Sequence, residues 1–383
     1  MQARSNALFP LNCFFDNVKD EIIMKRIGCL IRWVLVTLNV LVAIGFLISA
    51  YSPYISPVSH PLWACAGLFF PFLFLGNLFF LLIWLCIRWK YAFFPLLVFI
   101  AGWSSIWTYC PLGTEKEPDG GEVIKLLTYN TQDIAATRDY DKEQGNPVLN
   151  YLRNSDADII CLQEFTPGGK VKQKEVDQAL DVYPYHKMIR VKGGSGLACY
   201  SRYPILSETC LDYSSQYNGS VLYRLKLGKD TLVLINNHLE SNKLDAHDKV
   251  VYNDILNSPR EENVKNGGRY LLHKLAEAVA IRAPQADSVA YAILENRTRY
   301  MLVCGDFNDS PISYAHRVIG QGLNDVYTKA ASGPGFTYNE NHFYFRIDHI
   351  FASDGFRILK CQVDRSIKAS DHYPVWCLLE KKQ

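Results

Sequence analysis

The hydrophobic and polar positions divide this chain into two parts of different character. Between Ile27 and Trp107 nearly every residue is apolar or aromatic, whereas the chain beyond this stretch mixes charged and apolar residues as a water-soluble domain does. Residues 111–121 separate the two parts and hold three glycines, two prolines and few apolar side chains, which is typical of a linker. We therefore expect a membrane segment over residues 1–110 and a soluble domain over residues 122–383.

Three apolar stretches in the first part have the length of membrane-spanning helices. Ile27–Ala50 and Leu62–Ile87 can each cross a hydrocarbon layer of about 30 Å, and Tyr91–Trp107 is of marginal length. A cleavable signal peptide is the alternative for the first stretch, but its apolar run is longer than that of a typical signal peptide and two more stretches follow. The pattern thus predicts three transmembrane helices.

Basic residues lie before or at the start of the first span and again between the second and third spans. They are Lys19, Lys25, Arg26, Arg32, Arg88 and Lys90. The connection at 51–61 contains neither Lys nor Arg. Because short loops rich in Lys and Arg stay in the cytoplasm, we expect a multi-pass membrane protein with a cytoplasmic N-terminus and its soluble domain on the extracytoplasmic side.

Asn39 and Asn77 are the strongly polar side chains well inside the predicted spans. A hydrogen bond between helices is one explanation for them, and a role in transport is the other. We favour the hydrogen bond between helices, because a polar side chain in hydrocarbon needs a partner.

Short apolar runs in the soluble part have the length and content of β-strands. The runs are Val123–Tyr129, Ile159–Leu162, Leu197–Ile205, Val221–Leu227, Thr231–Asn236, Met301–Cys304, Phe343–Ala352 and Val375–Leu379. Gly193–Gly196 and Gly228–Asp230 predict hairpin turns. Pro147–Arg153 predicts a helix, Leu271–Leu294 one or two amphipathic helices packed on a sheet, and Lys249–Lys265 an exposed loop.

Polar side chains follow several of these strands at the point where the apolar run ends. In Cys304–Asp309 a short strand leads into Asp306 and Asn308, whose side chains would point the same way on an extended backbone. A carboxylate beside a carboxamide can hold an oxyanion or a hydrated metal, whereas an Asx-rich turn is the alternative for this stretch alone.

Eight polar residues lie, nearly all of them, at the ends of strands that are otherwise made of core residues. They are Asn130, Glu164, His238, Asp306, Asn308, Asp348, Asp371 and His372. Polar groups with separate structural roles would not be expected to lie at strand ends so consistently. The set therefore favours a catalytic site.

Charge and cysteine content exclude some classes of protein. The formal net charge is +2 over 383 residues, which is typical neither of a protein that coats nucleic acid nor of an acidic protein. Cys161, Cys199, Cys304 and Cys377 lie inside apolar runs, where cysteine acts as a small core residue. We therefore expect few or no disulfides, and no cysteine spacing resembles a zinc site.

Seven short motifs follow one another along the soluble part. They are Leu-Thr-Tyr-Asn at 127–130, Leu-Gln-Glu at 162–164, Ser-Arg-Tyr-Pro-Ile at 201–205, Asn-His-Leu at 237–239, Gly-Asp-Phe-Asn at 305–308, Ile-Asp-His-Ile at 347–350 and Ser-Asp-His-Tyr-Pro at 370–374. In these motifs the chain resembles the endonuclease/exonuclease/phosphatase superfamily, which includes deoxyribonuclease I, abasic-site endonucleases, neutral sphingomyelinases and inositol polyphosphate phosphatases. The resemblance covers about residues 122–381. It implies an α/β (α+β) fold, a four-layered sandwich of two mainly antiparallel β-sheets flanked by helices.

The resemblance also implies roles for the polar residues. Glu164 would be the principal ligand of Mg²⁺, or of Mn²⁺, with Asn130 beside it and Asp371 supporting the metal site. His372 would act as general base or as the group that polarises the phosphate. Asp348 would orient its ring, because a carboxylate partner fixes the tautomer and raises the pKa of an imidazole.

Three further residues complete the site that the resemblance implies. Asp306 and Asn308 would position the attacking water and the phosphate. His238 stands where deoxyribonuclease I and the neutral sphingomyelinases have a second histidine, usable as the acid that protonates the leaving oxygen. Abasic-site enzymes carry Asn-x-Asp where this chain has Asn130-Thr131-Gln132, so metal binding by an aspartate of the first motif is in doubt. The implied reaction is in-line attack of water on a phosphorus ester.

Three functions stay open, because this scaffold hosts many substrates. The first is a membrane-anchored, Mg²⁺-dependent phosphodiesterase acting on a lipid head group or a related phosphoester, favoured because the tether keeps the site near a bilayer. The second is an exported nuclease, although the basic residues that could contact phosphates are scattered. They are Lys170, Lys172, Lys174, Lys187, Arg190 and Lys192. The third is a non-catalytic membrane protein that binds through this fold, which would be expected to have lost some of the eight residues. The sequence predicts no protein partner.

Overall fold

The structure is a computed structural model of the 383-residue chain, and it describes residues 11–135, 140–141, 143–191, 193–242, 246–258, 260, 263–340 and 343–382. Contacts between residues divide the chain into two units. One unit is formed by residues 1–47 and 71–101, and the other by residues 48–70 and 102–383. The second unit therefore contains the connection between the first two apolar stretches in addition to the predicted soluble domain.

The apolar N-terminal region is helical. Its helices are α1 (Leu11–Tyr51), α2 (Pro61–Ala64), α3 (Phe70–Ile87), α4 (Phe93–Ala101) and α5 (Trp103–Tyr109). Among the described residues, two stretches are helical, long and apolar enough to cross a membrane, Met24–Tyr54 and Pro61–Ile87. The third stretch is bent by 67° between α4 and α5 and qualifies only if this bent pair counts as one span. The prediction of three spans is thus confirmed only in part.

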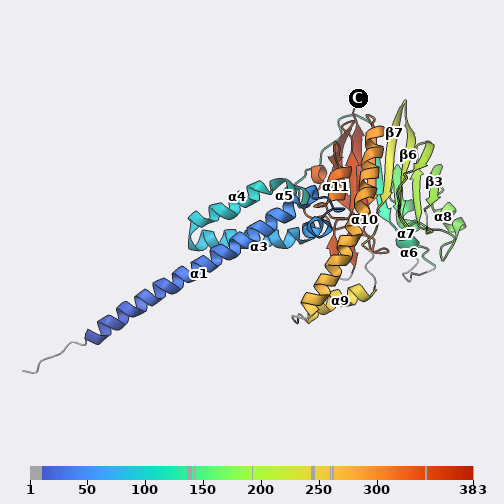
Figure 1. The fold of residues 1–383 in the computed structure, drawn as a ribbon. Coiled ribbons are helices and arrows are strands. Elements are labelled where there is room, and N and C mark those ends of the chain that lie inside the picture. Colours follow the sequence, from blue (N-terminus) through green and yellow to red (C-terminus); the bar gives the residue numbers. More distant parts are fainter. Residues whose placement is uncertain are drawn as a thin grey trace, which may run out of the picture. The chain divides into compact units, whose positions relative to one another are not determined.

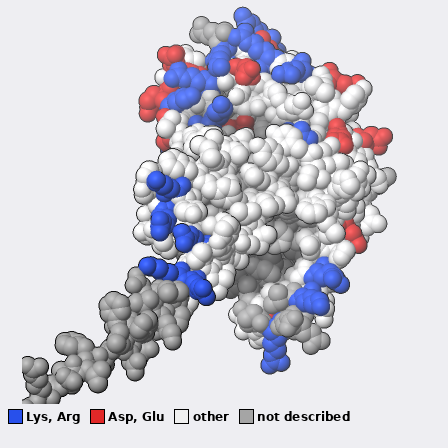
Figure 2. Space-filling view, turned by 60° about the vertical axis from the view of Figure 1, so that its left-hand side comes forward, with Lys and Arg blue, Asp and Glu red and all other residues white. Residues whose placement is uncertain are grey.

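Charged side chains are rare in this region of the sequence. Residues 33–87 contain no Lys, Arg, Asp or Glu, and many of their large apolar side chains are exposed. Figure 2 shows one face of the molecule with a broad area that lacks charged side chains, bordered by groups of them. Such a surface is expected of helices that face hydrocarbon rather than water.

The two asparagines inside the apolar helices join neighbouring helices. Nε1 of Trp84 donates a hydrogen bond to Oδ1 of Asn39 at 2.9 Å. Nδ2 of Asn77 donates to the carbonyl of Pro95 at 3.1 Å. The expected hydrogen bonding between helices is therefore confirmed for both residues.

Two six-stranded sheets lie at the centre of the second unit (Figure 1). The strands of the first are β1 (Val123–Asn130), β2 (Ile159–Gln163), β3 (Tyr185–Arg190), β4 (Gly196–Ser201), β13 (Phe356–Val363) and β14 (Val375–Lys381), and those of the second are β5 (Ile205–Cys210), β6 (Gly219–Leu227), β7 (Asp230–His238), β8 (Met301–Asp306), β9 (Asn324–Asp325) and β12 (Asp348–Ala352). Their orders are β13-β14-β1-β2-β4-β3 and β5-β6-β7-β8-β12-β9. Neighbouring strands are antiparallel except β1–β2 and β7–β8, which are parallel. Both predicted hairpins form, β3–β4 and β6–β7.

Apolar side chains fill three layers around the sheets. Residues such as Leu126 and Leu302 pack between the two sheets. On the outer face of the first sheet lie α7 (Pro147–Arg153) and α8 (Gln173–Ala179), and on that of the second lie α10 (Gly268–Glu295) and α11 (Tyr314–Ile319). The expected sandwich of helix, sheet, sheet and helix is confirmed.

The cysteines within the strands are core residues, as their apolar surroundings predict. Cys161, Cys199, Cys304 and Cys377 are fully buried. The cysteines from Cys29 to Cys377 are all free. Buried thiols of this kind act as small apolar groups.

Residues 111–121 form neither helix nor strand, but they are attached to the second unit. The backbone N–H of Gly113 donates to the carbonyl of Ala331, and that of Lys116 donates to the carbonyl of Leu359. The N–H groups of Asp119 and Gly121 donate to the carboxylate of Glu380. This stretch is therefore fixed along the domain, although it buries little apolar surface.

Lys249–Lys265 is not the exposed loop that its charge predicts. Ala246–Asn257 forms the helix α9, and a π-helical turn follows at Asn263–Gly267. In the first turn of α9 the buried Asp248 pairs with Lys274 of α10. An ion pair with a distant helix stabilises α9, and the local sequence does not show it.

Two predicted strands are interrupted. Phe343–Ala352 breaks between β11 (Phe343–Phe345), which pairs with β10 (Tyr338–Glu340), and β12. At this break the N–H groups of Ile347 and Asp348 donate to Oγ1 of Thr337 instead of to a neighbouring strand. The run Leu197–Ile205 is likewise interrupted: β4 ends at Ser201, and β5 begins just after Pro204, which has no N–H to donate to a ladder.

Candidate active site

The strand registers bring the predicted polar residues to one edge of the two sheets. In the first sheet β1 and β2 run parallel, so Asn130 at the end of β1 lies beside Glu164, which follows β2. In the second sheet His238 of β7 pairs with Asp306 of β8, and Asp306 pairs with Asp348 at the start of the antiparallel β12. Parallel strands end, and antiparallel neighbours begin, at the same edge of a sheet. The five residues therefore meet there.

A cavity of about 240 Å³ opens at this edge. Its polar lining consists of Glu164, Ser241, Asn242, Arg282, Asp306, Asn308, Asp309, Ser310, Tyr338, Asp371 and His372. Its apolar lining consists of Leu68, Leu275, Val279, Phe345 and Ile347. Five of the eight predicted residues thus line the cavity. The other three, Asn130, His238 and Asp348, lie next to those five.

His372 is held by a carboxylate. Its Nδ1 lies 2.8 Å from Oδ2 of Asp348, and its Nε2 lies 3.7 Å from Oδ2 of Asp306. Burial lowers the pKa of His372, but the carboxylates of Asp348 and Asp306 outweigh burial and raise that pKa well above its usual value. The imidazole therefore holds a proton at neutral pH, and the ring edge packs against Tyr338 with the ring centres 5.2 Å apart.

His238 lies on the other side of Asp306 and differs in charge. Its Nε2 lies 3.6 Å from Oε1 of Glu164 and 3.8 Å from Oδ2 of Asp306. Its Nδ1 is buried and, in the described part of the chain, has no hydrogen-bond partner. Burial lowers the pKa of His238. One cavity edge therefore holds a protonated and a neutral histidine.

Asp306 and Asn308 meet through a turn and not along an extended strand. β8 ends at Asp306, and Asn308 has φ of 52°, in the left-handed region. The N–H of Asn308 donates to Oδ1 of Asp306 at 2.8 Å, and its Nδ2 donates to the carbonyl of Leu239 at 2.9 Å. The expected extended geometry is wrong, because an Asx-type turn folds the backbone here. Both side chains still face the cavity.

Glu164 also has a left-handed backbone, with φ of 48°. Nδ2 of Asn130 lies between two carboxylates and donates to Oε1 of Glu164 at 3.2 Å and to Oδ2 of Asp306 at 3.0 Å. Burial, together with the nearby carboxylates of Asp371 and Asp306, raises the pKa of Glu164 to about 7, against the opposing hydrogen bond from Asn130 and the charge of His372. Non-glycine residues in this backbone region are uncommon and cluster at functional sites.

The donor set around Glu164 fits a divalent cation. Carboxylates crowd this edge of the cavity. Among the lining residues that the structure describes, Arg282 is the one Lys or Arg, and its charge is paired with Asp309. Carboxylate and amide oxygens are the ligands that Mg²⁺ prefers. An opposite charge would relieve the mutual repulsion that raises the pKa of Glu164.

A second group of side chains could also hold a metal. Ligand atoms of Asp306, Asp348 and His372 all lie within 4.8 Å of one another. The hydrogen bond between Asp348 and Nδ1 of His372 competes with this use, since those two atoms already satisfy each other. Both candidate metal sites, the one around Glu164 and this one, lie on the side of the cavity that contains Asp306.

Arg282 is a site residue that no motif indicated. This residue of α10 is 1% exposed, and its Nη1 lies 2.8 Å from Oδ2 of Asp309. Its Nε donates to the carbonyl of Glu240 at 2.9 Å, and its Nη2 donates to Oδ1 of Asn242 at 2.6 Å. Arg282 thus joins the loops that follow β7 and β8. In the sequence, Arg282 could have been noticed as a single arginine on the apolar face of the predicted helix.

A polar contact between the sheets lies beneath the site. Nε2 of Gln163 donates to Oδ1 of Asn236 at 2.6 Å, and Nδ2 of Asn236 donates to the carbonyl of Leu162 at 3.0 Å. Gln163 and Asn236 are fully buried; Gln163 directly precedes Glu164, and Asn236 lies two residues before His238. Their signal was a polar side chain at the end of an otherwise apolar run.

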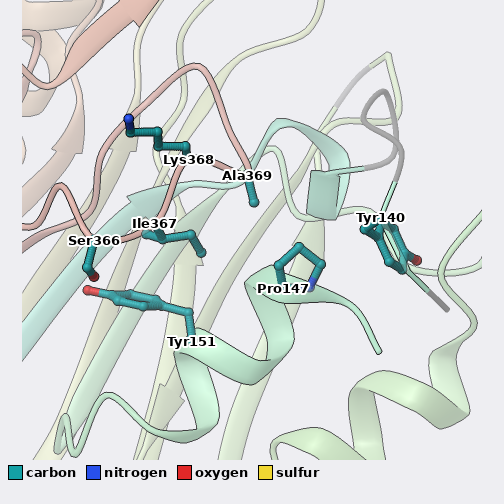
Figure 3. Close-up of a pocket in the computed structure, with 7 residues that line it drawn as sticks. All are labelled: Tyr140, Pro147, Tyr151, Ser366, Ile367, Lys368 and Ala369. Atoms are coloured by element: carbon teal, nitrogen blue, oxygen red, sulfur yellow. The ribbon is translucent and has the colours of Figure 1, made fainter. Parts of the chain in front are cut away.

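A second hollow of about 540 Å³ lies beside α7 (Figure 3). It is lined by Tyr140, Pro147, Tyr151, Ser366, Ile367, Lys368 and Ala369. The hydroxyl of Tyr151 donates to Asp364 at 2.9 Å. No carboxylate or histidine is among these lining residues, so we assign no acid–base chemistry to this hollow.

Two profiles of protein families match parts of this sequence. Residues 127–372, more than half of the chain, match the sequence profile of the Endonuclease/Exonuclease/phosphatase family, and residues 32–109 match a domain of unknown function. A search of curated proteins found no match.

Several solved structures are similar to this chain. The catalytic domain of human Nocturnin with bound sulfate is 13% identical, with coverage of 68% of this chain and 95% of that one and a TM-score of 0.49. TDP2 of D. rerio, complexed with a single-strand DNA product, is 16% identical, with coverage of 68% and 100% and a TM-score of 0.47. An endonuclease/exonuclease/phosphatase family protein from Bacteroides thetaiotaomicron is 17% identical, with coverage of 69% and 99% and a TM-score of 0.45. On the match of the family profile, the chain belongs to the endonuclease/exonuclease/phosphatase family.

Proposed function

We propose that the protein is a membrane-anchored, divalent-metal-dependent phosphoesterase that hydrolyses a phosphodiester by in-line attack of water. The observation that carries the proposal is the convergence of His372, Asp306 and Glu164 on one cavity. Hydrolysis of a phosphoester needs stabilisation of developing negative charge and a positioned water. The cavity offers a group for each need.

The charge of the cavity favours a diester over a monoester. Carboxylates outnumber the cationic groups in the polar lining. A phosphomonoester dianion brings more negative charge into this environment than the monoanion of a diester, and like charges at close range repel strongly in a partly buried site. The diester is therefore the better substrate for this lining.

The residues divide the work of hydrolysis. The protonated His372, oriented by Asp348, donates a hydrogen bond to a phosphate oxygen and stabilises the charge that develops on it. Asp306, whose pKa is raised by burial, accepts a hydrogen bond from the attacking water, and Asn308 fixes the carboxylate of Asp306. His238 is neutral, and we assign to it an Nε2–H hydrogen bond to the leaving oxygen.

Glu164, Asn130 and Asp371 are the residues that we assign to the metal. Bound there, Mg²⁺ or Mn²⁺ would supply Lewis-acid stabilisation of the phosphate oxygens. For Asn130 this requires the carboxamide to present its oxygen instead of its nitrogen, since Nδ2 faces Glu164 and Asp306 in the structure. Such a rotation exchanges two groups of nearly equal size.

Substitution of the central residues tests the proposal. The full chain in detergent should hydrolyse bis-p-nitrophenyl phosphate with Mg²⁺, lose this activity in EDTA, and regain it with added Mg²⁺ or Mn²⁺. His372→Ala and Asp306→Ala should each abolish hydrolysis without a change in the far-ultraviolet circular dichroism spectrum. His186→Ala, at an exposed histidine stacked on Tyr200, should keep wild-type activity. Full activity in both site variants contradicts the proposal.

We further infer three membrane spans with the catalytic unit on the extracytoplasmic side. The inference is supported by the basic residues before the first span and by their absence from 51–61. Protease added to intact cells should digest the part beyond residue 122. Complete protection of this part in intact cells, with digestion after lysis, contradicts the orientation.

A further inference from the structure

The connection between the first two apolar stretches is part of the catalytic unit. Residues 48–70 group with residues 102–383 and form short helical turns, which are η1 (Ser52–Tyr54), α2 and η2 (Cys65–Phe69). α2 and η2 pack on α10, and η1 packs on α11. A connection whose only purpose is to join two spans needs no such packing.

Two contacts hold this connection in place. Nε of Arg317 in α11 donates to the carbonyl of Pro53 at 2.8 Å, and its guanidinium lies 5.0 Å from the centre of the Tyr54 ring. At Gly67, an added Cβ would lie 1.9 Å from the carbonyl oxygen of Ile312, so only glycine allows the backbones to approach this closely. Ile312 follows the polar lining by two residues, and the connection is therefore fixed against the edge of the cavity.

The connection contributes directly to the apolar lining. Leu68 of η2 packs with Leu275 and Val279, which lie one turn apart on α10 and share a face. Buried Cys65 and Ala276 extend the same cluster beneath them. Leu68 and the two α10 residues thus form a fixed apolar part of the cavity that holds Asp306 and His372.

We propose that the apolar lining is a subsite for an apolar substituent of the phosphodiester, so that the substrate is a diester with an alkyl or acyl group, the chemistry of a membrane lipid. This inference rests on the proposed function. An apolar surface inside a reactive cavity stabilises an apolar ligand group by removing both from water. A membrane could supply such a ligand. Leu68 itself belongs to the stretch Pro61–Ile87, which is apolar enough to cross a membrane.

The charges of the lining agree with this choice. The one Lys or Arg among the described lining residues, Arg282, is already paired with Asp309. A polyanionic substrate would need unpaired cations to neutralise its successive phosphates. A substrate with one phosphodiester and an apolar tail needs neither more cations nor a longer groove.

A series of soluble diesters tests the subsite without a bilayer. Methyl, ethyl, butyl and hexyl p-nitrophenyl phosphate present the same leaving group and charge to the full chain in detergent, and differ only in the alkyl group. For the wild-type protein, kcat/KM should rise with chain length by about fourfold for each methylene that enters the subsite. Leu68→Ser should lower kcat/KM for the hexyl ester by about tenfold and leave the methyl ester within about twofold.

Leu62→Ser is the matched control, because Leu62 belongs to the same connection but is exposed and lies outside the cavity. Leu62→Ser should keep the wild-type dependence of kcat/KM on alkyl chain length. A loss of this dependence in Leu68→Ser alone then cannot come from partitioning of the longer esters into detergent. Val279→Ala tests the lining from the α10 side and should also reduce the dependence.

The outcomes separate the two proposals. Wild-type protein that hydrolyses no ester with Mg²⁺ contradicts the proposed function. Wild-type protein that hydrolyses all the esters equally well supports the proposed function and overturns the subsite. A Leu68→Ser variant that loses the methyl and hexyl esters equally, or that keeps the full dependence on chain length, shows that Leu68 is not the specificity residue.

Discussion

The polar and the apolar lining of the cavity have different origins in the chain. The polar lining comes largely from residues at the ends of strands, where the registers of β1–β2 and β7–β8 fix their positions. The apolar lining comes from η2, α10 and the segment around β11, which lie outside the strands that carry the chemistry, and Leu68 lies before the family match begins. The difference indicates that residues on the sheets determine the reaction, whereas elements packed around the sheets select the substrate.

The two linings also differ in how their members depend on one another. Polar side chains such as Asp306 contact several neighbours, so one substitution disturbs many hydrogen bonds. Apolar side chains such as Leu68 contribute by the area they bury, which changes in small steps. Substitutions in the polar lining should therefore change the rate for every substrate. Substitutions in the apolar lining should change which substrate is hydrolysed fastest.

The largest effect should come from Asp348→Asn. It removes the carboxylate that most raises the pKa of His372 but keeps a side chain of the same shape. We expect kcat/KM for bis-p-nitrophenyl phosphate to fall by roughly a hundredfold to a thousandfold. The imidazolium form should also be lost at lower pH, so the basic limb of the pH profile should move towards acid.

A second buried pair of histidine and aspartate provides the control for this substitution. Nε2 of His316 lies 3.2 Å from Oδ2 of Asp325, and neither residue lines the active cavity. Asp325→Asn should lower thermal stability, because Asp325 also caps α12 (Val326–Ala330). Its pH profile should keep the wild-type limbs, and an equal shift in both variants would contradict a specific role for Asp348.

The next effect concerns the residue that supports the polar lining. Arg282→Met should leave the carboxylate of Asp309 buried and unpaired, at a cost of about 3 kcal/mol in folding free energy, or roughly a 10 °C lower melting temperature. Burial already raises the pKa of Asp309, and loss of Arg282 raises that pKa further. The defect should therefore shrink as the pH falls and Asp309 takes up a proton.

An exposed ion pair is the control for Arg282. Nη2 of Arg153 lies 3.8 Å from Asp181, with side chains 50% and 60% exposed. Arg153→Met should change the free energy of unfolding by less than about 1 kcal/mol at any pH. If Arg282→Met has as little effect as Arg153→Met, the loops after β7 and β8 do not depend on the ion pair of Arg282 with Asp309.

The fold could be predicted where local pattern decides it. Strands such as β1 and β2 lie between two apolar layers, so their sequences are apolar runs bounded by polar residues. The prediction failed where distant contacts decide. The helix α9 depends on the pair of Asp248 with Lys274, and the break before β12 depends on the hydroxyl of Thr337.

The site shows the same limit. The eight polar residues were found because nearly all of them lie at the end or the start of an apolar run that forms a strand. Such strand ends converge on one edge of the sheets whatever the loops do. Arg282 and Leu68 were not found, because helix α10 and the connection at 48–70 reach the cavity only through tertiary packing. A single sequence does not show which helix face meets which loop.

A smaller effect should follow from the titration of Glu164. Its pKa of about 7 in the metal-free protein means that metal and proton compete for the carboxylate below that pH. The apparent Kd for Mg²⁺, measured by isothermal titration, should be nearly constant above pH 8 and rise about tenfold per pH unit below pH 7. Glu164→Gln should bind weakly with little dependence on pH. A wild-type Kd that stays constant from pH 8 to pH 6 contradicts the assignment of Glu164 to the metal.

The smallest effect should be that of salt on KM. It shows whether charged or apolar contacts select the substrate. A protein that holds duplex DNA through 6–10 phosphate contacts loses roughly 10³–10⁵ in affinity between 50 and 200 mM salt. The cavity has one Lys or Arg among its described lining residues, paired with Asp309, and the subsite that we propose for the alkyl group is apolar. We therefore expect KM for the hexyl ester to change by less than about threefold over this range. Apolar binding does not weaken with ionic strength as charge pairing does. A steep rise in KM with salt, together with faster hydrolysis of DNA than of the hexyl ester, would mean that basic residues outside the cavity select the substrate, as the nuclease alternative requires.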